Sequence, residues 1–156
     1  MLEIDIPGFG LTRLEHLVTD FSGTLSVDGK LLHGVREQLN AIAQFLTVHI
    51  VTADTFGTVQ REVEGIQGGL KLLSPGDQDI QKEEYVKKLG ADHVVAVGNG
   101  NNDRRMLHAA RLGIAVMEGE GASSQAVMAA AIVVRNIADA LGLLLNPMRC
   151  KATLRF

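Results

Sequence analysis

Short apolar stretches alternate along the chain with longer segments in which apolar residues recur every three or four positions. A short apolar stretch is typical of a strand, and the longer period is typical of a helix. Residues 94–97 are apolar throughout, as expected for a strand of a parallel sheet that is covered on both faces. The pattern predicts strands over residues 14–19, 48–51, 70–73, 94–97, 113–117 and 132–134.

The segments between these strands are predicted to be helical. One helix covers residues 35–46, and another begins at Asp79 and ends at Gly90, a residue type that often follows the last turn of a helix. A third covers about residues 103–111, and a closing helix is expected to end at Pro147, because proline cannot continue a helix. Helices therefore separate the predicted strands.

A small hairpin is predicted within residues 25–32, where Asp28-Gly29 lies between apolar pairs. Strands that alternate with helices predict an α/β three-layer sandwich with a mainly parallel, Rossmann-like sheet. The 156 residues suit one domain, over residues 1–156. In such a fold ligands bind at the carboxyl ends of the strands.

Composition excludes several classes of function. The net charge is −3 and there is no basic tract, so no nucleic-acid partner is expected. The longest apolar run, residues 126–134, is far shorter than the roughly 20 residues needed to span a bilayer, so no membrane partner is expected either. A single cysteine, Cys150, and acidic residues near the N-terminus favour a cytoplasmic location.

Polar residues follow several of the predicted strands. Asp20 ends the first strand, directly before a Gly-Thr turn, and Thr52 ends the second. Lys82 lies in the first turn of a predicted helix, and Asn99 and Asp103 follow the strand over residues 94–97. Taken singly, each has an ordinary explanation as a turn residue, a helix cap or a solvated charge.

Together these groups have the chemistry of a phosphate site. A carboxylate can attack phosphorus, while a hydroxyl and an ammonium group can hold phosphoryl oxygens. A second carboxylate near the first can hold Mg²⁺. The residues therefore predict a magnesium-dependent site for a phosphorylated small molecule or macromolecule.

The order of these motifs resembles that of the haloacid dehalogenase superfamily. Residues 20–24, Asp-Phe-Ser-Gly-Thr, are similar to the Asp-Lys-Thr-Gly-Thr motif of P-type ATPases, a branch of that superfamily. Residues 97–103 are similar to their Val-Gly-Asp-Gly-x-Asn-Asp motif, and Lys82 with the apolar residues after it resembles their lysine helix. The likeness runs from about Val18 to Leu145 but includes no membrane helices, actuator domain or nucleotide-binding insert. The chain thus resembles a soluble phosphorylation core.

The resemblance implies a phosphatase or phosphotransferase that acts through an aspartyl-phosphate. Asp20 would be the nucleophile, Thr52 would hydrogen-bond the phosphoryl group, and Lys82 would offset negative charge. The implied ligands of Mg²⁺ are Asp20, the backbone carbonyl of Ser22, Asn99 and Asp103.

Two positions depart from the family pattern. Ser22 occupies the place where most phosphatases of the superfamily carry an aspartate as general acid and base, a role typically worth ~10²–10⁴-fold in rate. Asn99 occupies the place of an acid and removes one negative charge from the metal site. Slow hydrolysis and a persistent phosphoenzyme are therefore expected.

The chain also lacks a cap domain, because the hairpin and the segment after Thr52 are both too short to form one. Uncapped members of the superfamily act on large substrates or close the site by oligomerisation. A homo-oligomer is therefore expected, formed through the hairpin around Asp28-Gly29 with its neighbours Leu25 and Leu31.

Two other functions fit parts of the pattern. The Gly-Asn-Gly of residues 98–100 resembles a dinucleotide fingerprint, but Asp103 stands in place of the third glycine and would repel a pyrophosphate. With Ser22 and Asn99 substituted, the domain could instead be a regulatory module that binds Mg²⁺ and phosphate without turnover, or an oligomeric scaffold. Retention of Asp20 and Lys82 favours chemistry.

Overall fold

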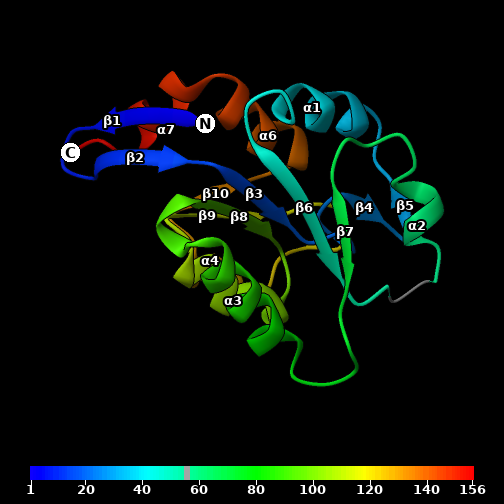
Figure 1. Cartoon of the computed structure of the whole chain (residues 1–156). Helices are drawn as coiled ribbons and strands as arrows, with labels where there is room; N and C mark the ends of the chain where they lie inside the picture. Colours follow the sequence, from blue (N-terminus) through cyan, green and yellow to red (C-terminus); the bar gives the residue numbers. More distant parts are fainter. Residues whose placement is uncertain (55–56) are drawn as a thin grey trace.

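A computed structural model describes residues 1–54 and 57–156, and these contain a central sheet of six strands (Figure 1). The strand order is β10-β9-β8-β3-β6-β7, and every neighbouring pair is parallel. This confirms the predicted α/β architecture. The strands are β3 (His16–Thr19), β6 (Thr47–Thr52), β7 (Gly69–Leu72), β8 (Val94–Gly98), β9 (Leu112–Val116) and β10 (Ile132–Val134).

Helices cover both faces of the sheet, which makes three layers (Figure 1). On one face lie α1 (Val35–Ile42) and α6 (Ile137–Leu145); on the other lie α3 (Gln78–Leu89), α4 (Arg104–Ala109) and α5 (Ser124–Ala129). The shorter elements are α2 (Val59–Glu62), η1 (Ala91–His93) and η2 (Asn101–Asp103). Within the described ranges, no helix has both the length and the apolar character needed to cross a bilayer.

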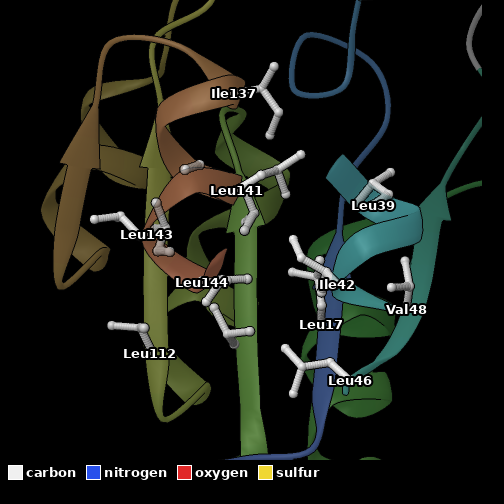
Figure 2. Close-up of a cluster of buried hydrophobic side chains, with 14 of the residues drawn as sticks. Leu17, Leu39, Ile42, Leu46, Val48, Leu112, Ile137, Leu141, Leu143 and Leu144 are labelled. Atoms are coloured by element: carbon white, nitrogen blue, oxygen red, sulfur yellow. The ribbon is translucent and has the colours of Figure 1, made fainter. Parts of the chain in front are cut away.

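The sheet divides the core into two clusters, because successive side chains of a strand point to opposite faces. Leu17 packs with Leu39 of α1 and Leu141 of α6, and this cluster fills the space between the sheet and those helices (Figure 2). The next residue, Val18, lies in the second cluster, with Val86 of α3. Both faces of β3 are thus buried, as its apolar sequence predicts.

The two ends of the chain differ from the sequence prediction. A hairpin of β1 (Leu2–Ile6) and β2 (Gly10–Leu14) precedes the sheet, so the strand predicted over residues 14–19 is in fact the end of β2 followed by β3. At the other end, α6 stops at Leu145 and Pro147 begins a further helix, α7 (Pro147–Leu154). Proline suits the first turn of a helix because the amide hydrogen it lacks has no partner there.

The hairpin predicted within residues 25–32 is present as β4 (Ser26–Val27) and β5 (Lys30–Leu31). Asp28 and Gly29 both have positive φ, at 51° and 77°, as the tight turn of a two-residue hairpin requires. Leu25 is fully buried and Leu31 packs against the core, so these side chains are largely used within the chain. Self-association through this hairpin stays a prediction.

Candidate functional site

Asp20 lies at the carboxyl end of the central strand of the sheet. It follows β3, which pairs with β6 on one side and β8 on the other, and its amide donates to the Val97 carbonyl at 3.0 Å. The Asp20 residue is only 5% exposed. The strand thus fixes a nearly buried carboxylate where three parallel strands end.

Lys82 reaches this carboxylate from the start of the second turn of α3, because the helix begins at Gln78, one residue earlier than predicted. Its Nζ lies 2.8 Å from Oδ1 of Asp20 and 2.7 Å from Oδ1 of Asp103, and the residue is fully buried. A buried ammonium group is tolerated only when it is paired and hydrogen-bonded. Lys82 is therefore a component of the site rather than a solvated charge.

Asp103 ends η2 and is also fully buried. Its Oδ2 accepts hydrogen bonds from the backbone amides of Asn99 and Gly100, at 3.0 and 2.8 Å. A β-carbon at Gly98 would lie 2.5 Å from Cγ of Asp103, so this close approach requires glycine. Asp103 therefore holds both the turn after β8 and the ammonium group of Lys82.

Burial and neighbouring charges shift the ionisation of Asp20 and Lys82. Burial, reinforced by the negative charge of Asp103, raises the pKa of Asp20 to about 6, against the opposing effect of Lys82. Burial lowers the pKa of Lys82, but the carboxylates of Asp20 and Asp103 outweigh this and raise it well above its ordinary value. With all three ionised, the group carries one net negative charge, which a bound cation would balance.

Thr24 connects Asp20 to Asn99. Its hydroxyl donates to Oδ1 of Asn99 at 3.0 Å and lies 3.4 Å from Oδ2 of Asp20, while Nδ2 of Asn99 donates to the Gly121 carbonyl at 3.0 Å. Gly23 has φ of +77°, and a β-carbon there would lie 2.5 Å from Nδ2 of Asn99. The sequence analysis gave Thr24 no role, although its place in the motif of residues 20–24 was the available signal.

Of the predicted site residues, Ser22 and Thr52 make the fewest side-chain hydrogen bonds within the described part of the chain. Oγ of Ser22 is a buried polar atom without a hydrogen-bond partner in the described part of the chain. Oγ1 of Thr52 accepts from the amide of Asp54 at 3.4 Å, and Thr52 is buried at the end of β6. Thr52 thus lies at the same edge of the sheet as Asp20, but within residues 1–54 and 57–156 no hydrogen bond joins the two side chains.

The donor set at this edge fits a hard cation. Oδ2 of Asp20 has a long contact of 3.4 Å with the Thr24 hydroxyl, and the amide oxygen of Asn99 accepts from the same hydroxyl. Oxygen ligands of this kind, together with the Ser22 carbonyl, suit Mg²⁺. Oγ of Ser22, which has no hydrogen-bond partner among the described residues, could accept or donate one further hydrogen bond. Oδ1 of Asp103 accepts from Lys82 and has a second lone pair that could face a metal, whereas Oδ2 accepts from two backbone amides. The described residues contain no group of three or more His, Cys, Asp or Glu side chains placed to hold a metal, so a cation would depend on carbonyl and amide oxygens.

Comparison with sequence families gives one match and one relative. Residues 77–143 match the model of haloacid dehalogenase-like hydrolases. An uncharacterised protein of Methanocaldococcus jannaschii is 44% identical over 99 residues, which cover 62% of this chain and 97% of that protein. The family match includes Lys82, Asn99 and Asp103.

Solved structures share the fold. The cobalt-bound deoxy-D-mannose-octulosonate 8-phosphate phosphatase of Haemophilus influenzae has a TM-score of 0.72 at 13% identity, covering 92% of this chain and 94% of that one. The 3-deoxy-D-manno-octulosonate 8-phosphate phosphatase of Moraxella catarrhalis, in complex with magnesium, phosphate and sugar acid, has a TM-score of 0.66 at 19% identity, covering 89% and 90%. At such low identity the likeness establishes the fold alone.

Proposed function

We propose that this chain, whose residues 77–143 match the model of haloacid dehalogenase-like hydrolases, is a magnesium-dependent phosphatase that forms an aspartyl-phosphate on Asp20. The observation that carries this proposal is the buried contact of Lys82 with Asp20 and Asp103 at the carboxyl end of the central strand. A structural ion pair would be equally stable elsewhere in the core, whereas this one lies where ligands bind in open α/β sheets.

Asp20 is the nucleophile in this proposal. Oδ1 is held by Lys82, so Oδ2 is the oxygen free to attack a phosphoric monoester. The Oδ2–P bond forms as the ester P–O bond breaks, and the leaving oxygen departs with the bonding electrons and takes a proton from solvent. Water then attacks phosphorus as the Oδ2–P bond breaks, which releases phosphate and restores the carboxylate, and the proton lost by the water goes to solvent. Lys82 stays protonated throughout, because both neighbouring carboxylates favour its charged form.

The remaining residues orient the phosphoryl group. Asp20, the Ser22 carbonyl and Asp103 would hold Mg²⁺, which when bound offsets the charge of the phosphoryl oxygens. Thr52 donates to one of these oxygens from the end of β6. Asp103 keeps the ammonium group of Lys82 beside the reacting carboxylate.

Ser22 decides how fast the cycle turns. A serine hydroxyl is a poor proton relay near pH 7, so both departure of an alkoxide and attack by water lack general acid and base help. Ser22 also supports the finer assignment to a P-type-ATPase-like group, since those pumps carry a hydroxyl residue at this position. The proposed enzyme is therefore slow, favours leaving groups that depart without a proton, and accumulates phosphoenzyme.

The test is release of phosphate from an aryl phosphate with and without Mg²⁺. Activity is expected only with the metal, and Asp20→Asn must abolish it. Acid-quenched mass spectrometry should find one labile phosphoryl group on the peptide that contains Asp20. Absence of both turnover and adduct would leave a regulatory phosphate-binding module as the better function.

Ser22→Asp tests the proton relay directly. The variant should hydrolyse phosphoric monoesters ~10-fold faster or more, because its aspartate can act as the base when water attacks the phosphoenzyme. Ser22→Asn is the matched control, with similar size and no titratable group. Equal rates for the two variants would show that proton transfer does not limit turnover.

The natural substrate class is a phosphoric monoester, of either a small molecule or a macromolecule. Because two structures with this fold are phosphatases of a sugar-acid 8-phosphate, a substrate screen should begin with phosphorylated sugars and sugar acids. Self-association would close the site in the absence of a cap, and light scattering in the micromolar range measures it.

A further inference from the structure

Asn99 has contacts that an aspartate in its place could not reproduce. Its Nδ2 lies 3.0 Å from the Gly121 carbonyl oxygen, and its Oδ1 lies 3.0 Å from the Thr24 hydroxyl. A carbonyl oxygen can only accept a hydrogen bond, so the atom facing Gly121 must be a donor. An ionised carboxylate has no donor and would instead repel that carbonyl.

The carbonyl of Gly121 belongs to a loop over residues 118–122, between β9 and α5, that runs along one side of the site. Near its start, Glu118 accepts from the first amide of α6 at 3.3 Å, and at its end the Ser123 amide donates to the Asn99 carbonyl at 2.8 Å. In between, Glu120 accepts from the amide of Asp28 in the β4–β5 hairpin at 3.1 Å. The loop therefore links the hairpin to the end of β8.

The other side of the Asn99 amide affects the nucleophile. The Thr24 hydroxyl has a single proton, and two oxygens compete for it: Oδ1 of Asn99 at 3.0 Å and Oδ2 of Asp20 at 3.4 Å. Because the shorter contact is to Asn99, the Thr24 proton points away from Asp20. Oδ2 of Asp20 is left without a strong donor and keeps its lone pairs for another partner.

We propose that Asn99 is a positioning residue whose amide ties Thr24 to the 118–122 loop and thereby keeps Oδ2 of Asp20 free. On this view position 99 requires asparagine because its amide must both accept from Thr24 and donate to the Gly121 carbonyl, and Asn99 is not a weakened metal ligand. The part that concerns Asp20 rests on the proposed function, whereas the tie between Thr24 and the loop does not.

The test compares Asn99→Asp with Asn101→Asp. Both add one negative charge to the same turn, but the Asn101 side chain is exposed and makes no hydrogen bond among the described residues. In metal-free protein, amide exchange of Gly121 and Ser123 should accelerate ~10-fold in Asn99→Asp, about the effect of losing one hydrogen bond, and stay unchanged in Asn101→Asp. This measurement needs no catalytic activity, so it tests the link between Thr24 and the 118–122 loop even if no substrate is found.

A second readout separates positioning from metal binding. In Asn99→Asp the turnover of an aryl phosphate should fall, while the Mg²⁺ concentration for half-maximal rate stays the same or rises. Slower exchange of the loop together with a lower Mg²⁺ requirement and faster turnover would overturn the proposal, because that is the behaviour of a restored ligand.

Thr24 gives an independent pair of variants should Asn99→Asp fail to fold. Thr24→Val removes the donor and keeps the shape, whereas Thr24→Ser keeps the donor. Faster exchange at Gly121 in Thr24→Val, rescued in Thr24→Ser, supports the tie, and equal exchange in the two variants overturns it.

Discussion

Two polar clusters lie beneath α3, and they differ in charge. At the carboxyl end of the strands, Lys82 pairs with two carboxylates, and all three groups are charged or nearly so. Towards the amino end, Nδ1 of His16 lies 3.1 Å from Nε2 of His49, whose Nδ1 lies 2.9 Å from the hydroxyl of Tyr85. Burial, with a smaller effect of His16, lowers the pKa of His49 and favours its uncharged form, so we call this second group the neutral cluster.

The same helix, α3, thus contributes one side chain to a charged cluster and one to a neutral cluster. Tyr85 follows Lys82 by one turn of α3, so both project toward the same face of the sheet. The neutral cluster satisfies its own hydrogen bonds and needs nothing further. The charged cluster has one unbalanced negative charge, and the hydroxyl of Ser22 near it has no hydrogen-bond partner in the described residues. A bound cation and a polar ligand could satisfy both.

The largest expected effect comes from Lys82→Met, which leaves two buried carboxylates without their cation. We expect the free energy of unfolding at pH 8 to fall by about 3–5 kcal/mol, measured by urea denaturation. Lys87→Met on the exposed side of α3, where Lys87 pairs with Glu83, should change the free energy of unfolding by less than about 0.5 kcal/mol. A loss of similar size in both variants would show that the buried cluster has no special energetic role.

Ligand binding should stabilise the charged cluster alone. Mg²⁺ with beryllium fluoride at about 100 times its Kd should add about 2.7 kcal/mol to the free energy of unfolding. The shift is expected to survive in Tyr85→Phe, which alters the neutral cluster, and to vanish in Asp20→Asn. A shift that persists without the Asp20 carboxylate would move the binding site elsewhere.

The pH dependence of metal-free protein should show the raised pKa of Asp20. The folded state holds the proton up to about pH 6, while the unfolded chain loses it near 3.8. Stability from this group is therefore complete below pH 3.8 and is lost as the pH rises to about 6, by at most about 1.4 kcal/mol per pH unit. Urea midpoints measured in EDTA should show this fall in wild type and not in Asp20→Asn; identical profiles would contradict the assignment.

The smallest expected effect is that of Tyr85→Phe in the neutral cluster. Removing the hydroxyl deletes one half-buried hydrogen bond to His49, which should cost about 0.5–1.5 kcal/mol at pH 8. Phosphatase activity should be unchanged, since no hydrogen bond joins this cluster to Asp20 in the described residues. A large loss of activity would mean that the two clusters communicate through α3.

Sequence reasoning succeeded where local pattern and topology agree. Asp20 and Asp103 each follow a predicted strand, and parallel strands bring their carboxyl ends together, so their proximity could be expected. Lys82 was expected through its helix, although not its complete burial. The six strands of the sheet were predicted for the same reason, since each is a short apolar stretch between helices.

The features that were missed depend on contacts between distant segments. His16 meets His49 only because β3 and β6 pair with His16 opposite Thr47, and no spacing in the chain reveals that register. Thr24 and Asn99 are 75 residues apart, and their bond depends on the close approach that Gly23 allows. The β1–β2 hairpin has an alternating pattern, but it lies outside the alternation of strands and helices from which the fold was predicted.

The surplus negative charge beside Asp20 also determines which ligand binds first. A phosphate dianion that approaches the metal-free site meets like charge in a poorly solvated setting, where repulsion is strong. A cation meets attraction at the same place. Association of the proposed enzyme is therefore sequential, with cation before phosphate. A substrate that chelates magnesium in solution will lower the concentration of magnesium-bound enzyme. The rate of phosphate release should therefore fall at high substrate concentration.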